Sequence, residues 1–182
     1  MTKSRLTLLV LSLAIVSLAL SYGAYRLTHS TTPLPPIPVA GIGSQRPDFS
    51  FPDTAGNLRE ASEWQGKVML INFWATWCPP CRREIPDLLK LYHRYRDQGL
   101  VIVGIGVDHP DSVRRFVADL SMDYPNLLGG EAGTGLSMRY GNRTAALPYS
   151  VIVDRTGKII QTYVGALKES VAERTIQPLL SN

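Results

Sequence analysis

The sequence predicts a layered α/β sandwich for most of the chain. Residues 67–74 and 100–107 are almost unbroken apolar runs, which is typical of strands buried on both faces of a sheet. Between them, apolar side chains recur at helical spacing over residues 79–98. Two further strand-like segments and a helix follow near the C-terminus, so the order is β-α-β and then β-β-α. This order implies right-handed crossovers and helices that cover a central sheet.

A short N-terminal β-hairpin is expected at the start of the folded part. The turn-forming residues 53–57 separate the strand-like segment 49–51 from Leu58. The helix over residues 79–98 has a regular apolar face, and Gly99 ends it. That face consists of Ile85, Leu88, Leu89, Tyr92 and Tyr95.

The second half of the chain alternates similar elements. Helices are expected over 111–120, 133–140 and 169–180, and strands over 149–153 and 158–164. The glycine-rich segment 129–135 lacks the Gly-Lys-Ser/Thr ending of a phosphate-binding loop, so we expect a flexible loop there.

Composition and charge exclude several classes of protein. The chain has 182 residues, 45% of them hydrophobic, which predicts one domain with attachments and a substantial core. The formal net charge is +4, but Lys3, Arg5 and Arg26 flank an apolar leader and leave 16 basic residues against 15 acidic ones. A body so nearly neutral offers little basic surface, so no nucleic-acid partner is expected.

The leader predicts contact with a membrane. Residues 6–20 form an apolar run behind Lys3 and Arg5, which is typical of a secretory signal or a signal anchor. We expect an uncleaved anchor, a transmembrane helix over residues 1–27, with the amino end in the cytoplasm and the rest of the chain outside. A Pro-rich linker over residues 28–47 would then space the membrane from a domain over residues 48–182.

The only two cysteines form a C-x-x-C motif, Cys78 and Cys81, between a buried strand and a helix. Free N–H groups at a helix amino terminus stabilise a thiolate and lower the pKa of the first cysteine. Cys78 is therefore the expected nucleophile, exposed at the helix tip, and Cys81 is the resolving thiol. Pro79 and Pro80 suit the first helical positions and would hold the pair in place.

Metal binding is the competing interpretation of the motif. A C-x-x-C pair supplies only half of a zinc site, and His29, His93 and His109 are scattered without ligand spacing. Dithiol redox chemistry is the better interpretation of the C-x-x-C motif, and neither a metal nor a cofactor is expected. A copper-binding or copper-delivery module ranks last.

Several motifs together resemble the membrane-anchored thiol-disulfide oxidoreductases of the TlpA/ResA type, which also include CcmG/DsbE-like proteins, in the thioredoxin superfamily. They are Trp-Cys-Pro-Pro-Cys at residues 77–81, Cys-Arg-Arg-Glu-Ile-Pro at 81–86, Ala-Leu-Pro-Tyr-Ser-Val-Ile-Val-Asp at 146–154 and Gly-Lys at 157–158. The resemblance implies a thioredoxin-like three-layer sandwich with the N-terminal hairpin. It also implies a central insert, within residues 108–135, that holds an extra strand and helix, with residues 125–128 as the candidate for that strand.

The resemblance also implies roles for particular residues. Pro148 is expected in the cis form beside the cysteines, where it presents the backbone of Leu147 to the substrate. Glu84 corresponds to an acidic residue that modulates the thiol pKa values, and Asn72 replaces the buried Asp of thioredoxins. The expected catalytic residues are thus Cys78, Cys81, Glu84 and Pro148, and the expected substrate-binding residues are Trp77, Pro79, Pro80 and Leu147.

The function expected on these grounds is reduction of specific protein disulfides, in cytochrome c maturation or metal-site assembly. The protein would be a single-pass protein of the bacterial inner membrane with its catalytic domain in the periplasm. Its partners would be protein disulfides, such as those of apocytochrome c or copper-site assembly proteins, and a transmembrane electron donor. The alternative is an oxidant or isomerase of the same fold, because a low-pKa thiolate makes a disulfide less stable.

Overall fold

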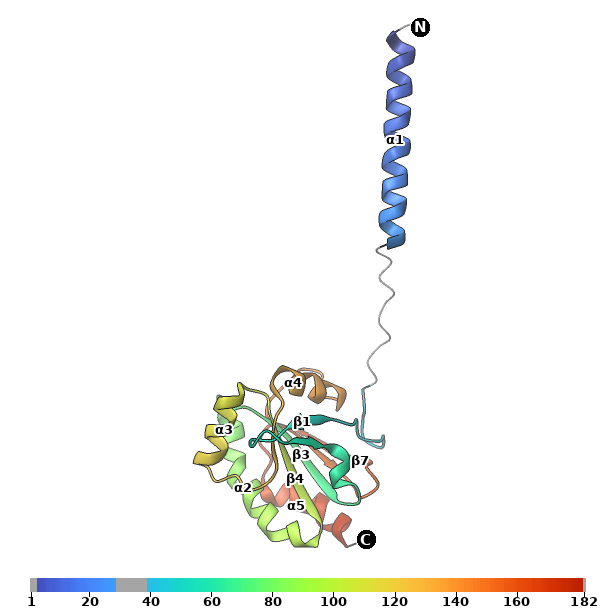
Figure 1. The fold of residues 1–182 in the computed structure, drawn as a ribbon. Coiled ribbons are helices and arrows are strands. Elements are labelled where there is room, and N and C mark those ends of the chain that lie inside the picture. Colours follow the sequence, from blue (N-terminus) through green and yellow to red (C-terminus); the bar gives the residue numbers. More distant parts are fainter. Residues whose placement is uncertain (1–2, 29–38, 182) are drawn as a thin grey trace. The chain divides into compact units, whose positions relative to one another are not determined.

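The computed structural model describes residues 3–28 and 39–181 (Figure 1). Its core is a five-stranded sheet with the strand order β5-β4-β3-β6-β7. The strands are β3 (Val68–Trp74), β4 (Leu100–Gly106), β5 (Asn126–Leu128), β6 (Tyr149–Val153) and β7 (Ile159–Val164). β3, β4 and β5 run parallel, whereas β6 is antiparallel to β3 and β7 is antiparallel to β6. Every residue of β3 and β4 is buried, which confirms the prediction from their apolar runs.

The side chains of β3 alternate between two hydrophobic clusters, one on each face of the sheet. The first cluster holds Leu70 and Trp74 and is completed by α2 (Pro79–Tyr95), α3 (Pro110–Asp119) and α5 (Glu169–Leu180). The second holds Ile71 and Phe73 and is completed by α4 (Gly130–Arg139) and the N-terminal hairpin. The result is three layers with the sheet in the middle.

The expected hairpin is present as β1 (Ser50–Pro52) and β2 (Leu58–Glu60), which form a separate two-stranded sheet. A 3-10 turn (Ala61–Trp64) leads from β2 toward β3. The Asp53 carboxylate holds the hairpin turn, because its Oδ1 accepts hydrogen bonds from the N–H groups of Ala55 and Asn57, both at 2.9 Å. The hairpin thus follows the turn chemistry of the sequence.

The predicted C-terminal end of α2 is also confirmed. A 3-10 turn (Arg96–Gln98) follows the helix, and Gly99 has the left-handed φ of 100° that favours glycine. The segment 108–135 contains α3 and β5, as the resemblance implies, and β5 is an edge strand of the sheet.

The prediction of a flexible loop over residues 129–135 is wrong, because α4 begins at Gly130. Glycine here permits close packing against β4. A Cβ atom on Gly129 would lie 2.6 Å from Cγ2 of Ile105, and one on Gly133 would lie 3.1 Å from the same atom. The glycines let the helix approach the strand, and the composition alone suggested flexibility instead.

The described part of the domain begins before residue 48, the boundary that the sequence suggested. The chain divides into the units 1–36 and 37–182. Ala40 N–H donates to the Arg139 carbonyl at 2.7 Å, and Gly43 N–H donates to the Ile159 carbonyl at 2.8 Å. These bonds tie the residues after 39 to α4 and β7, although the sequence placed them in the linker. Residues 29–38 of that linker lie outside the described residues.

The N-terminal unit contains helix α1 (Lys3–Thr28), which is 26 residues long. Within the described part of the chain, no helix is long and apolar enough to cross a membrane.

Candidate active site

The two cysteines lie at the junction between β3 and α2. β3 ends at Trp74 and α2 begins at Pro79, so Cys78 is the N-cap residue, with an extended backbone. Cys78 and Cys81 form a disulfide with a Cα–Cα distance of 5.3 Å, and the Cys81 N–H donates to the Cys78 sulfur at 3.3 Å. A donor aimed at this sulfur, together with the positive end of the helix dipole, stabilises a thiolate on Cys78 after reduction.

The prediction that Cys78 is exposed at the helix tip is wrong in degree. Its exposed fraction is only 3%, because the residue belongs to the hydrophobic cluster that α2 covers. Leu147 packs against that same cluster. Trp77, by contrast, is 67% exposed, as a surface residue beside the cysteine should be. Trp77 and Pro79 are therefore the residues of this motif that are most exposed to solvent.

A carboxylate that is not among the predicted site residues, that of Asp108, holds the loop before Cys78. Asp108 follows β4, and its Oδ2 accepts from both the hydroxyl and, at 3.3 Å, the N–H of Thr76. Its Oδ1 accepts from the His109 N–H at 2.6 Å. Burial alone would raise the pKa of Asp108, but these hydrogen bonds outweigh burial and hold the pKa below its usual value. The signal in the sequence was an acidic residue directly after an apolar strand.

Glu84 is buried one turn after Cys81 on α2, with 2% of its surface exposed. Its Oε1 accepts from the Asn72 side-chain amide at 2.8 Å, and its Oε2 accepts from the Leu167 N–H at 2.8 Å. Burial raises the pKa of Glu84 to about 7, although both hydrogen bonds act to lower it. A carboxyl group that titrates near neutral pH can take up or release a proton at working pH.

Asn72 links Glu84 to the neighbouring strand. Its Nδ2 also donates to the Ser150 hydroxyl of β6 at 2.9 Å. Asn72 and Ser150 are paired across the two strands, so the sheet itself sets this contact. The resemblance pointed to Asn72, whereas Ser150 follows Tyr149 inside a strand-like run and carries no motif of its own.

The Leu147–Pro148 peptide bond is cis, as the resemblance implies. Phe73 of β3 is paired with Tyr149 of β6, so Pro148 stands at the end of the sheet where β3 leads into the cysteine loop. Pro148 is buried and Leu147 is partly exposed. The geometry therefore brings Leu147, Pro148 and the two cysteines to the same end of the sheet.

Neither histidine of the described residues forms a metal-binding group with the cysteines. His93 Nε2 lies 2.7 Å from Asp123 Oδ2, and His109 is the N-cap residue of α3. No group of three or more His, Cys, Asp or Glu side chains within residues 39–181 and the described part of α1 could hold a metal ion. His29 lies outside the described residues.

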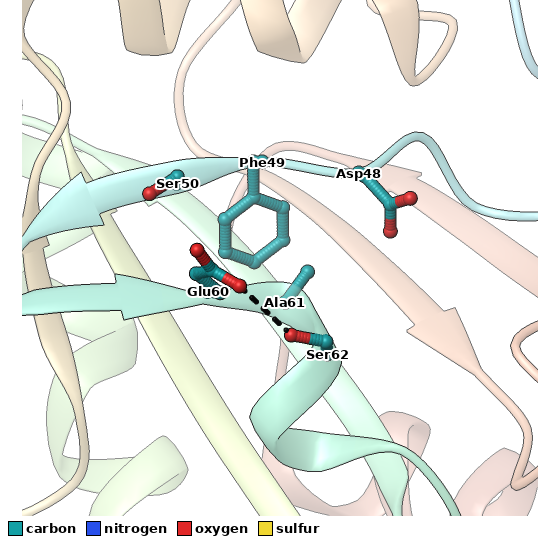
Figure 2. A pocket seen from close by; sticks show the side chains of 6 residues that line it. All are labelled: Asp48, Phe49, Ser50, Glu60, Ala61 and Ser62. Carbon is teal, nitrogen blue, oxygen red and sulfur yellow. Dashed lines mark hydrogen bonds between the residues drawn. The ribbon is translucent and has the colours of Figure 1, made fainter.

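A hollow of about 370 Å³ lies at the hairpin and not at the cysteines. Figure 2 shows the Phe49 ring between β1 and the residues that follow β2, with the Ser62 hydroxyl bonded to Glu60 at 3.2 Å. Its lining consists of Asp48, Phe49, Ser50, Glu60, Ala61 and Ser62. Since these include no predicted site residue, we assign the hollow no part in the thiol chemistry.

Comparison with known proteins gives consistent matches across the domain. A family model described as Redoxin matches residues 42–176. The thiol-disulfide oxidoreductase ResA of Halalkalibacterium halodurans is 32% identical over 166 residues, which cover 91% of this chain and 89% of that protein. The thiol:disulfide interchange protein HelX of Rhodobacter capsulatus is 36% identical over 131 residues, which cover 71% of this chain and 68% of HelX.

Solved structures agree. A thiol:disulfide interchange protein of the thioredoxin family from Chlorobium tepidum matches with a TM-score of 0.69 and 28% identity. The match covers 76% of this chain and 97% of that one.

Proposed function

The chain belongs to the Redoxin family, has a thioredoxin-like fold and is a thiol-disulfide oxidoreductase, and on that premise we propose that it reduces specific protein disulfides outside the cytoplasm. The observation that carries the proposal is the position of Cys78 at the amino end of α2, with the Cys81 N–H directed at its sulfur. This arrangement favours a reactive thiolate at Cys78 over a purely structural disulfide.

The proposed reaction is a two-step exchange. The Cys78 thiolate attacks one sulfur of the substrate disulfide, so a Cys78–substrate bond forms and the substrate S–S bond breaks. The Cys81 thiolate then attacks the Cys78 sulfur, which releases the second substrate sulfur as a thiolate. Two electrons pass from the dithiol to the substrate, whose thiolates take up protons from solvent. The chain is left in the Cys78–Cys81 disulfide state that the structure contains.

Glu84 supplies the proton chemistry of the second step in this scheme. Cys81 is fully buried and must lose its proton before it can attack. Glu84 lies one turn further along α2, and the raised pKa of about 7 allows it to accept that proton and return it later. Pro148 and Leu147 complete the proposed site, with Trp77, Pro79 and Pro80 forming the surface that a substrate meets.

The proposed location rests on the sequence of the leader. The apolar run of residues 6–20 behind Lys3 and Arg5 supports a signal anchor in the bacterial inner membrane, with the domain in the periplasm. A reductant there must itself receive electrons, so a transmembrane donor is part of the proposal. The proposed substrates are disulfides of apocytochrome c or of copper-site assembly proteins. Protease protection of spheroplasts before and after lysis tests the orientation.

The opposite direction of transfer is the second candidate. The helix amino terminus stabilises the Cys78 thiolate and therefore the reduced state, which favours an oxidant or isomerase if the effect is large. A copper-delivery role has less support, since the described residues bring no group of three or more His, Cys, Asp or Glu side chains together that could hold a metal ion.

Trapping in the parent cell tests the proposed mechanism. A Cys81→Ser variant cannot resolve the first intermediate, so mixed disulfides through Cys78 should accumulate outside the cytoplasm. A Cys78→Ser variant is the matched control and should trap little. Equal pools of trapped protein in the two variants would show that Cys78 is not the nucleophile.

A further inference from the structure

The loop between α4 and β6 is folded around the side chain of Asn142. This residue is 2% exposed, and its amide meets both peptide groups of one residue, Ala146. Asn142 Nδ2 donates to the Ala146 carbonyl at 2.9 Å, and Asn142 Oδ1 accepts from the Ala146 N–H at 3.1 Å. The side-chain amide thus pairs with Ala146 as a neighbouring strand would.

The amide is in turn fixed to the helix before it. Asn142 Nδ2 also donates to the Ser137 hydroxyl at 3.3 Å, and that hydroxyl donates to the Thr134 carbonyl at 2.8 Å. Both of these residues belong to α4. The position of Ala146 is therefore set by a chain of hydrogen bonds that starts on a packed helix.

The backbone between Asn142 and Ala146 is a tight reversal. The Ala145 N–H donates to the Asn142 carbonyl at 3.1 Å, and Ala145 has a φ of 50°, which is uncommon for a residue with a Cβ atom. Residues 143–145 are exposed and offer little packing to hold this shape. The buried Asn142 amide is the contact that stabilises it.

The residue after this reversal is Leu147, at the cis-proline. Both peptide groups of Ala146 are occupied by Asn142. The N–H and C=O of Leu147, in contrast, take part in no hydrogen bond among the described residues. A free donor and acceptor on one partly exposed residue can pair with the main chain of an extended peptide. Such pairing needs the two groups to be held in a fixed direction.

We propose that Asn142 is a positioning residue that fixes the Leu147 backbone for pairing with a polypeptide substrate, and so makes the dithiol selective for disulfides in peptides over small disulfides. The inference rests on the proposed function, since it concerns the substrates of the same dithiol. Asparagine suits the role because its side chain carries a donor and an acceptor in one plane, matching the carbonyl and the N–H of Ala146.

The test compares two disulfide substrates, one that has a peptide backbone and one that has none. The full chain is reduced, and its second-order rate constants are measured with a disulfide-cyclised peptide and with the small aromatic disulfide DTNB, which has no peptide backbone. Asn142→Ala removes both hydrogen bonds to Ala146. Asn142→Asp keeps the shape and the acceptor but removes the donor, so it serves if the alanine variant does not fold.

The matched control is Asn126→Ala. Asn126 is also a buried asparagine whose Nδ2 donates to a backbone carbonyl, that of Tyr124 at 2.7 Å, but it lies on the edge strand β5. Loss of a buried hydrogen bond is thus common to both variants, and only one of them touches the Leu147 loop.

We expect Asn142→Ala and Asn142→Asp to lower the rate constant for the peptide about tenfold and that for DTNB less than about twofold, while Asn126→Ala leaves the ratio unchanged. An equal fall with both disulfides, or no fall with either, would overturn the inference while leaving the proposed function intact. A wild-type chain that reduces DTNB but no peptide disulfide would instead overturn the proposed function, and the inference with it.

Discussion

The Asn72 side-chain amide donates a hydrogen bond of 2.8 Å to the Glu84 carboxyl group in the interior of the domain, between a central strand and the helix that carries the cysteines. Asn72 has no charge, and no charged group among the described residues offsets the burial of Glu84. The pKa of Glu84 is consequently raised to about 7 and not lowered. A buried acid that titrates near neutral pH links the redox site to the stability of the domain.

The first prediction concerns the pH dependence of stability. The pKa of Glu84 rises from 4.5 in the unfolded chain to about 7 in the folded one, so the folded state holds the proton more tightly. The stabilisation from this proton is complete below pH 4.5 and is lost as pH rises toward 7, by about 3 kcal/mol in total. Urea unfolding of wild type and Glu84→Gln at several pH values measures it. Glutamine does not titrate, so parallel curves for the two proteins would contradict the raised pKa.

The second prediction concerns the loop before Cys78. Asp108→Ala removes the acceptor for Thr76 and His109, so we expect the free energy of unfolding to fall by about 2 kcal/mol at pH 7. Because the pKa of Asp108 is lowered, its contribution is present above its usual range and fades as pH falls through the folded value. Asp111→Ala is the control, since Asp111 is exposed and its one ion-pair partner among the described residues is Arg114 at 2.9 Å. Equal effects of the two variants in urea unfolding would refute the role of Asp108.

The third prediction compares the effect on stability of replacing Gly129 and Gly135 with alanine. A Cβ atom on Gly129 would lie 2.6 Å from Cγ2 of Ile105, whereas one on Gly135 would meet nothing within 4 Å. Gly129→Ala should therefore destabilise the domain by about 1–3 kcal/mol. Gly135→Ala should stabilise it by up to about 1 kcal/mol, because alanine favours a helix. Thermal unfolding of both variants checks this, and a stabilising Gly129→Ala would contradict the close approach of α4 to β4.

The sequence predicted much of the fold because its signals are local. The apolar runs of β3 and β4, the regular face of α2 and the stop at Gly99 each depend on neighbouring residues. The place of the C-x-x-C motif between a strand and a helix is local in the same sense. The prediction that the Leu147–Pro148 bond is cis, in contrast, rested only on the resemblance to a family.

The remaining features depend on contacts between distant residues. Asp108 meets Thr76 across 32 positions of the chain, and Ser150 meets Asn72 across 78. The near-complete burial of Cys78 likewise depends on elements far along the chain. The hydrophobic periodicity of a sequence does not predict contacts of this kind. Asn142 and Ala146 are close in sequence, but the hydrogen bonds between them require the left-handed backbone conformation of Ala145. The sequence Arg-Thr-Ala-Ala at residues 143–146 contains no residue that favours this conformation.

The reduction potential of the Cys78–Cys81 couple tests the proposed direction of electron transfer most directly. The full chain would be equilibrated with mixtures of reduced and oxidised dithiothreitol or glutathione, and the fraction of disulfide measured by thiol labelling. A reductant of protein disulfides should have a potential near that of thioredoxin, about −270 mV. A potential near −120 mV would identify an oxidant and contradict the proposed function.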